Sequence, residues 1–177
     1  EKSAFNKSET LSEEKGIGVI ACGIGYNYVK ETGAKLSGLL KISQYPLPSK
    51  AIKALAAQCN EILVVEDGQP VVEQDIKALL GAGYPVTGRL TGKLPRTGEL
   101  TPDNVASALG ETIEKAYQAA SNIVARPPAL CPGCGHRDVY AALNKVVAEY
   151  PGGRIFGDIG CYTLGALPPF NALASCV

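Results

Sequence analysis

The stretch that decides the fold is residues 61–81, which read EILVVEDGQPVVEQDIKALLG. It opens with an apolar run between two glutamates, which is typical of a strand buried on both faces. Asp67-Gly68 marks a turn, and apolar residues spaced three to four apart then predict a helix over Val71–Leu80 that Gly81 closes. A buried strand followed at once by a helix predicts a parallel sheet covered by helices.

The same alternation of strand and helix extends to both sides of this stretch. Residues 1–15 are rich in charge and lack periodicity, which indicates a flexible or extended lead-in. Thr101-Pro102 predicts the start of a helix that runs to about Ala120. We therefore predict an α/β domain over residues 16–120 with a mainly parallel sheet. Its other expected elements are strands over residues 16–22, 36–42 and 85–90 and helices over residues 26–32 and 49–59.

A second unit follows a stiff segment. Residues 121–130 contain Arg126-Pro127-Pro128, which favours an extended linker. In residues 131–177 we predict one amphipathic helix and a strand at Arg154-Ile155-Phe156. These elements cannot bury both faces of a sheet, and the chain has no methionine, so we expect an incomplete domain in a piece of a longer protein. The apolar positions of the helix are Val139, Ala142, Leu143, Val146, Val147 and Tyr150.

Composition excludes several classes of function. Apolar residues make up 46% of the 177 residues and charged residues 19%, which is ordinary for a globular protein. Basic and acidic residues balance at 17 each, so charge gives no argument for binding nucleic acid or an anionic membrane. The sequence has no apolar stretch of membrane-spanning length and no secretory leader pattern in its first residues. We expect a cytoplasmic protein.

The cysteines point to a possible site in the last third of the chain. Cys22 and Cys59 end apolar runs and are expected to be buried free thiols. Cys131-Pro132-Gly133-Cys134-Gly135-His136 has the two-residue spacing that lets two thiolates converge. Zinc, an iron–sulfur cluster, a redox dithiol and plain unliganded thiols in a tight turn all fit this spacing. A third cysteine, Cys161, follows the next predicted strand and favours a cluster or zinc over a simple dithiol. His136 is a candidate fourth ligand of zinc.

A glycine-rich motif follows that strand. It reads Gly157-Asp158-Ile159-Gly160-Cys161-Tyr162-Thr163-Leu164-Gly165. Glycines after a strand can leave backbone N–H groups free to face a phosphate or a cofactor ring. An ordinary turn between strand and helix is an equally good interpretation.

Two weaker candidates lie in the first domain. Gly23-x-Gly25 follows a strand but lacks the third glycine of a dinucleotide fingerprint, because position 28 is tyrosine. Glu66-Asp67 ends a strand, where ligands collect, although a solvated turn is the simpler interpretation.

These late motifs carry a resemblance to a known family. The segments RPPALCPGCGH at 126–136 and GDIGCYTLGALPP at 157–169 are similar to the large subunit of indolepyruvate ferredoxin oxidoreductase, within the 2-oxoacid:ferredoxin oxidoreductase superfamily. The resemblance implies a parallel-sheet transketolase C-terminal-like domain over residues 16–120. It also implies that residues 131–177 start a thiamine-diphosphate-binding α/β domain.

The resemblance assigns roles to individual residues. Asp158, Gly160, Cys161, Tyr162 and Thr163 would border thiamine diphosphate. The ligands of a [4Fe-4S] cluster would be Cys131, Cys134 and Cys161. The Mg²⁺ ligands beyond the first glycine-rich motif, and the glutamate that activates the cofactor, would lie outside this chain.

The resemblance also implies a reaction and partners. The parent protein would oxidatively decarboxylate an aryl pyruvate with coenzyme A and pass electrons to ferredoxin, together with a smaller subunit. The 177-residue chain alone is expected to be inactive. The alternative is a zinc- or dithiol-bearing binding module attached to a flavodoxin-like domain.

Overall fold

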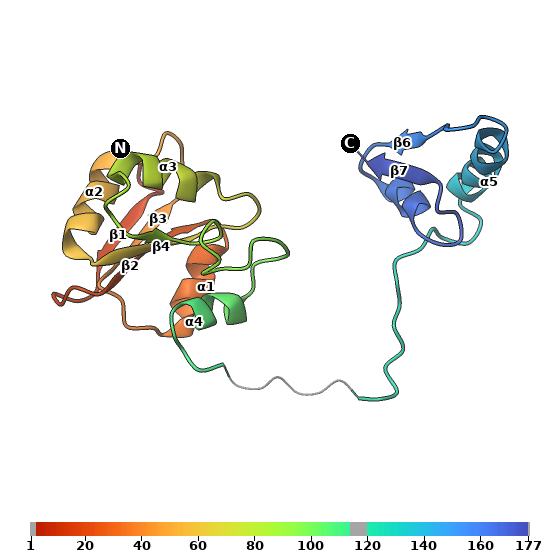
Figure 1. Cartoon of the computed structure of the whole chain (residues 1–177). Helices are drawn as coiled ribbons and strands as arrows, with labels where there is room; N and C mark the ends of the chain where they lie inside the picture. Colours follow the sequence, from red (N-terminus) through yellow and green to blue (C-terminus); the bar gives the residue numbers. More distant parts are fainter. Residues whose placement is uncertain (1–2, 114–119, 177) are drawn as a thin grey trace. The chain divides into compact units, whose positions relative to one another are not determined.

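The computed structural model describes residues 3–113 and 120–176, and the chain divides into two compact units. Unit 1 spans Glu1–Ala116 and unit 2 spans Tyr117–Val177. Each unit has its own sheet (Figure 1). Within the described residues, none of the helices has the length and apolar character needed to cross a membrane.

Unit 1 is built on a five-stranded sheet with the strand order β1-β3-β2-β4-β5. The pairs from β3 across to β5 are parallel, and β1 alone runs antiparallel, against β3. The mainly parallel α/β sheet expected from residues 61–81 is therefore confirmed. The strands are β1 (Lys7–Thr10), β2 (Ile17–Cys22), β3 (Gly38–Ile42), β4 (Glu61–Val65) and β5 (Val86–Thr87).

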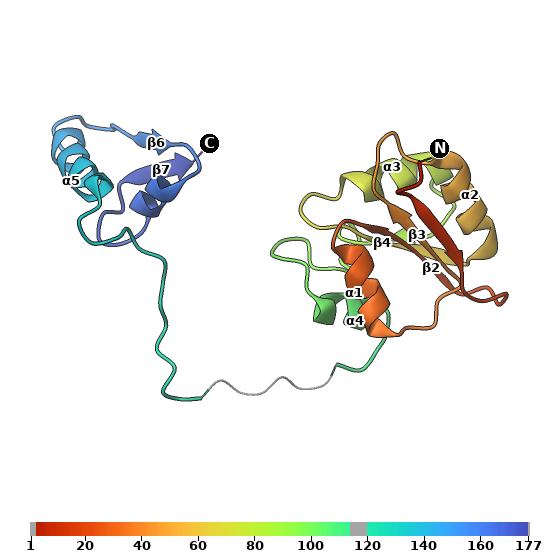
Figure 2. The same ribbon diagram turned by 180° about the vertical axis from the view of Figure 1, so that it is seen from behind.

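Helices cover both faces of this sheet (Figures 1 and 2). On one face, Val19, Leu39 and Leu63 pack with residues of α1 (Gly25–Thr32) and α4 (Pro102–Ala108). On the other face, Ile20, Leu40 and Ile62 pack with α2 (Ser49–Gln58) and α3 (Val71–Leu80). Neighbouring residues of one strand point to opposite faces, which explains why the central strands are apolar throughout.

Three predicted elements of unit 1 differ in the structure. Lys7–Thr10 is a strand, so this part of residues 1–15 is not a flexible lead-in; pairing with the edge of β3 orders it. The strand predicted over residues 85–90 covers Val86–Thr87, because Arg89 leaves the sheet and becomes buried. The helix from Pro102 ends at Ala108, before Gly110 with its φ of 81°, and positions 114–119 of the predicted helix lie outside the described residues.

Unit 2 has one long helix, a short 3₁₀ helix and a two-stranded parallel sheet. These are α5 (Gly135–Val147), β6 (Ile155–Gly157), η1 (Cys161–Ala166) and β7 (Leu173–Cys176). The α5 and β6 elements were predicted, whereas β7 was not. Its small residues carry no strand pattern of their own, and pairing with β6 makes it a strand.

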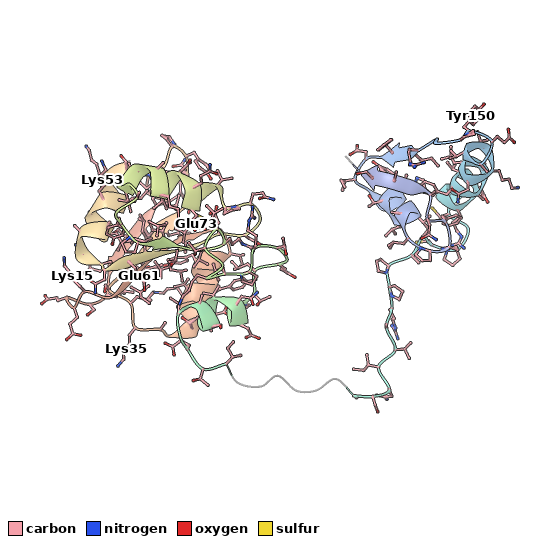
Figure 3. The ribbon with its side chains drawn as sticks, in the orientation of Figure 1. Lys15, Lys35, Lys53, Glu61, Glu73 and Tyr150 are labelled. Carbon is pink, nitrogen blue, oxygen red and sulfur yellow. The ribbon has the colours of Figure 1, made fainter. Side chains whose placement is uncertain are left out.

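The buried face of α5 also differs from the prediction. Val139 and Val146 are each 51% exposed, and Tyr150 beyond the helix is 63% exposed. Tyr150 projects outward from the unit in Figure 3. The buried side chain of α5 is Tyr140, which lies between the predicted apolar positions. The apolar pattern correctly predicted a helix, but it did not predict which face is buried within this unit.

Candidate cofactor site in unit 2

The CPGC motif forms a tight turn that starts α5. Gly133 has a φ of 75°, which favours glycine, and the backbone N–H of Cys134 donates to the carbonyl of Cys131 at 3.2 Å. Cys134 is the N-cap residue of α5 and is half-buried, whereas Cys131 is exposed. Sγ of Cys134 lies 3.4 Å from Nδ1 of His136. The turn therefore presents a thiol–imidazole contact and a second, accessible thiol.

The glycine-rich motif closes on itself. The Asp158 carboxylate accepts a hydrogen bond from the N–H of Ile159 at 2.7 Å. The Thr163 hydroxyl accepts from the N–H of Gly160 at 3.0 Å and donates to the Asp158 carbonyl at 3.3 Å. A Cβ atom at Gly160 would lie 2.8 Å from the ring of Tyr162, so this position accepts no larger residue without movement of the ring. These N–H groups of the loop are thus already used within it.

The structure brings the two motifs together through Tyr162. Its carbonyl accepts a hydrogen bond of 2.6 Å from the hydroxyl of Tyr140 on α5, and its ring lies edge-on to His136 with centroids 5.7 Å apart. Gly165 packs so closely on Tyr140 that a Cβ there would overlap the ring. The cysteine turn and the glycine-rich loop therefore form one local site, as a loop before a helix and the end of the next strand can do.

The predicted cofactors require more than this site provides. Among the described residues, no group of three or more histidine, cysteine, aspartate or glutamate side chains is placed to hold a metal ion. Cys161 is exposed, and the contact made by Cys134 is with His136. A cluster needs four ligands in close array, and a diphosphate needs free N–H groups. The described residues thus hold no ready metal site, and two N–H groups of the loop, those of Ile159 and Gly160, are already engaged.

Sequence reasoning missed the residues that hold this site together. Besides Tyr140, Asn144 donates to the Phe170 carbonyl at 2.8 Å, and Arg137 donates to the Leu130 carbonyl at 3.1 Å while its guanidinium lies 5.5 Å from the Phe170 ring centroid. Residues 137, 140 and 144 recur at the spacing of one helix face. A second, polar and aromatic stripe on the predicted helix was the available signal.

The Glu66-Asp67 candidate of unit 1 has a structural role. Glu66 is 5% exposed, and its carboxylate accepts hydrogen bonds from the N–H groups of Val72 and Glu73 at 2.9 and 2.8 Å. Burial raises the pKa of Glu66, while these two backbone hydrogen bonds act in the opposite direction. The Asp67 carboxylate accepts from the buried Arg89 at 2.9 Å. Glu66 therefore stabilises the first turn of α3, whereas Asp67 holds the buried Arg89, and neither interpretation from sequence foresaw these roles.

The fold is an α/β protein with a mostly parallel sheet, and unit 2 packs together the two motifs on which the resemblance to 2-oxoacid:ferredoxin oxidoreductases rests. Sequence comparison confirms that resemblance. The chain is homologous to a segment of the indolepyruvate oxidoreductase subunit IorA, with identities of 32–35% to six such proteins over nearly all of its length. No family model matches the chain.

Two of these relatives illustrate the extent of the match. IorA of Archaeoglobus fulgidus is 35% identical over 96% of this chain and 30% of that protein. IorA of Thermococcus kodakarensis is 34% identical over 98% of this chain and 29% of that protein. The chain thus spans about three tenths of the length of the curated relatives it matches.

Among solved structures, the chain is similar to a 2-oxoglutarate:ferredoxin oxidoreductase from Magnetococcus marinus. The TM-score is 0.48 and the identity 18%, over 62% of this chain and 20% of that one. A similarity of this size determines neither fold nor function.

Proposed function

We propose that this chain is the segment of an indolepyruvate:ferredoxin oxidoreductase large subunit that joins a transketolase C-terminal-like domain, residues 16–120, to the start of the thiamine-diphosphate-binding domain, residues 131–177. Residues 121–130 are the linker between them. The observation that supports this proposal is the identity of 32–35% to IorA subunits over 96–98% of the chain. The site in unit 2 is consistent with it, because the two motifs that identify the family contact each other.

The reaction of the parent protein would be the oxidative decarboxylation of an aryl pyruvate to its coenzyme A thioester, with electrons passed to ferredoxin. A smaller subunit would be its partner, and we propose a cytoplasmic location. The implied cofactors are thiamine diphosphate with Mg²⁺, which serves as an electron sink in decarboxylation, and a [4Fe-4S] cluster. The parent protein, and not this chain alone, is the proposed enzyme.

Site residues follow from the same proposal. In the parent protein, thiamine diphosphate would contact Asp158, Gly160, Cys161, Tyr162 and Thr163. Because Ile159 and Gly160 already donate their N–H groups within the loop, binding would require this loop to open. The cluster ligands would be Cys131, Cys134 and Cys161, which would have to be rearranged by segments outside this chain.

A segment exchange tests the function. IorA of Archaeoglobus fulgidus, carrying this chain in place of its matching segment, would be produced with its smaller subunit. We expect indolepyruvate- and coenzyme-A-dependent reduction of a viologen dye, and loss of it when Gly160 is changed to Val, because a Cβ at Gly160 meets the Tyr162 ring. Circular dichroism confirms that each hybrid is folded. A folded hybrid that keeps Gly160 but is inactive would contradict the proposal.

The 177-residue chain by itself is expected to bind thiamine diphosphate and Mg²⁺ weakly or not at all. Binding would have to supply the free energy needed to open and rearrange the glycine-rich loop, because the loop is closed on itself. Calorimetric titration measures this directly, and micromolar binding would show that the cofactor determinants are misplaced.

The contact between Cys134 and His136 also agrees with a second function. A zinc- or dithiol-bearing module attached to a flavodoxin-like domain would use these same residues. Metal analysis of the purified chain separates the two proposals. Zinc at one equivalent would support the module, whereas a purified chain that holds no stoichiometric zinc would agree with the oxidoreductase, whose cluster needs segments outside this chain.

A further inference from the structure

Strand β1 forms one edge of the sheet in unit 1. Its inner side pairs with β3, and among the described residues no strand pairs with its outer side. Such a free side presents backbone N–H and C=O groups that can pair with another extended segment. Two devices that commonly protect an edge are missing here, because β1 contains no proline and its register with β3 has no bulge.

A large apolar side chain lies at each end of this edge. Phe5, just before β1, is 68% exposed, and Leu11, just after it, is 48% exposed. Single exposed apolar residues are common on protein surfaces. These two flank an unpaired strand edge, however, so a segment that paired with β1 would remove both from water.

The sequence of this edge is complementary to itself. Residues 5–11 read FNKSETL, with a basic and an acidic residue on either side of Ser8 and an apolar residue at each end. A second copy of the chain would pair antiparallel to β1 about a twofold axis, which is the usual symmetry of a dimer. If the sheet continues from one copy to the other, this axis is perpendicular to the sheet. Side chains that share a face must then lie opposite each other.

Charge selects one register for this pairing. Lys7 and Glu9 share a face, because side chains alternate along a strand. Registers that place Lys7 opposite Lys7, or Glu9 opposite Glu9, bring like charges together, which destabilises a sheet. The register between them places Ser8 opposite Ser8 and each Lys7 opposite Glu9 of the second copy. It also brings Phe5 of one copy toward Leu11 of the other.

The Glu9 carboxylate can accept this additional partner. It accepts hydrogen bonds from the Tyr26 hydroxyl at 2.6 Å and from Lys30 at 2.9 Å, and the Glu9 side chain remains 28% exposed. The hydrogen bond from Tyr26, followed by that from Lys30, holds the pKa of Glu9 below its usual range, so the carboxylate is ionised. A carboxylate has about four acceptor positions, which leaves room for Lys7 of the second copy. A lysine usually keeps an edge strand from pairing, but an ionised carboxylate directly opposite removes that obstacle.

We propose that β1 pairs with β1 of a second copy of this chain, in the register centred on Ser8, so that the two five-stranded sheets form one continuous sheet. The contact lies wholly in unit 1 and does not depend on the function proposed for the parent protein. Because strands of four residues bury little surface, the dimer should be weak, with a dissociation constant on the order of 0.1 mM.

Disulfide trapping in the 177-residue chain tests the register. Ser8→Cys puts two thiols on the twofold axis, where opposite Cα atoms are about 4.5–5.5 Å apart, within the range that a disulfide spans. With oxidised glutathione as the oxidant, we expect a covalent dimer, and peptide mapping should place its disulfide between the two copies at position 8. Thr10→Cys is the matched control, because Thr10 is also exposed and shares the face of Ser8 but lies opposite position 6. It should form about fivefold less dimer.

Sedimentation velocity at several concentrations tests the charge pairing. Lys7→Glu places like charges opposite each other at both symmetric positions and should weaken the dimer about tenfold. Within one copy, Lys7 lies opposite Lys41, so the introduced glutamate should not weaken the pairing of β1 with β3. Lys93→Glu is the control, since it makes the same change at an exposed residue after β5, at the opposite edge of the sheet, and it should leave association unchanged.

Three outcomes would overturn the proposal. The first is a chain that stays monomeric at every concentration up to about 1 mM, well above the expected dissociation constant. The second is a dimer that Lys7→Glu and Lys93→Glu affect equally, because the association would then not involve β1. The third is equal trapping by Ser8→Cys and Thr10→Cys, which would mean that the strands do not meet in the register centred on Ser8.

Discussion

The two units bury their apolar residues to very different degrees. Of the apolar side chains that are buried in the described parts of the chain, unit 2 holds two, Leu130 and Tyr140, and unit 1 holds all the others. Unit 1 closes two cores around one sheet, whereas unit 2 is held mainly by hydrogen bonds around Tyr140 and by the β6–β7 pair. A parallel sheet needs cover on both faces, and only unit 1 has the elements to provide it among the described residues.

Cysteine accessibility should show the largest difference between the units. Burial is the first cause that raises the pKa of Cys22, to about 12, and of Cys59, so both thiols stay protonated at mildly alkaline pH. Cys59 is buried and Cys22 is half-buried, rather than fully buried as the sequence predicted. Cys131 and Cys161 are exposed. Iodoacetamide should label the exposed pair at least about tenfold faster, as peptide mapping would measure.

Labelling in concentrated urea is the control, because all these cysteines should then react at similar rates. Equal rates under native conditions would mean that unit 1 opens as readily as unit 2.

Truncation of one apolar side chain in each unit should give the second largest difference between the units. Leu63 is 2% exposed in the centre of β4, and Leu63→Ala should destabilise unit 1 by about 3 kcal/mol. Leu143 on α5 is half-buried, so Leu143→Ala should cost less than about 1 kcal/mol. Hydrogen exchange read separately in β4 and α5 measures each effect. Similar losses of protection from the two substitutions would show that unit 2 has a core of its own.

A single hydroxyl should have a smaller but local effect. Tyr140→Phe removes the hydrogen bond to the Tyr162 carbonyl and should destabilise the contact between α5 and η1 by about 1 kcal/mol. Faster hydrogen exchange is expected at residues 158–166 and not in unit 1. Tyr150→Phe is the control, since Tyr150 is largely exposed. No change in Tyr140→Phe would contradict the role given to Tyr140.

The smallest expected effect concerns the edge strand β1. The pKa of Glu9 is lowered, first by the hydrogen bond from Tyr26 and then by Lys30. A carboxylate whose pKa falls on folding stabilises the fold above its unfolded pKa, and this stability is lost as pH falls through the folded pKa. Glu9→Gln should therefore lower the melting temperature by about 2 °C or less near neutral pH.

The difference between Glu9→Gln and the original chain should shrink as the pH falls through the acidic range, where Glu9 becomes protonated. Melting curves at several pH values measure it. A difference that is constant with pH would mean that the contacts of Glu9 with Tyr26 and Lys30 do not stabilise β1.

Much of unit 1 was predictable because its signals are local. The apolar run at 61–65 and the helical spacing of Val72 and Ile76 lie within a few residues of each other, and both residues are buried as expected. The interruption of β5 was not predictable, because it depends on Arg89. That side chain donates to the carbonyls of Pro95 and Gly98 and to that of Glu66, which lies 23 residues earlier in the chain.

The candidate site of unit 2 was predicted in part. In the structure Tyr162 joins the cysteine turn and the glycine-rich loop. The sequence predicted shared ligation by Cys131, Cys134 and Cys161, which stays a prediction. It did not predict that Cys134 would contact His136, or that the loop N–H groups would be used internally. The spacing of residues in the sequence shows which side chains can converge. The other contacts around each side chain determine which partner it binds.

The sequence by itself determined the order of strands and helices from β2 to α4, the parallel sheet and the relationship to IorA subunits, because periodicity and motifs are properties of the chain alone. The tertiary structure decided which edge β1 joins, which face of α5 is buried, and that Lys7 and Lys41 lie opposite each other. These features depend on residues that are distant in sequence and become neighbours only when the sheet and its helices have packed.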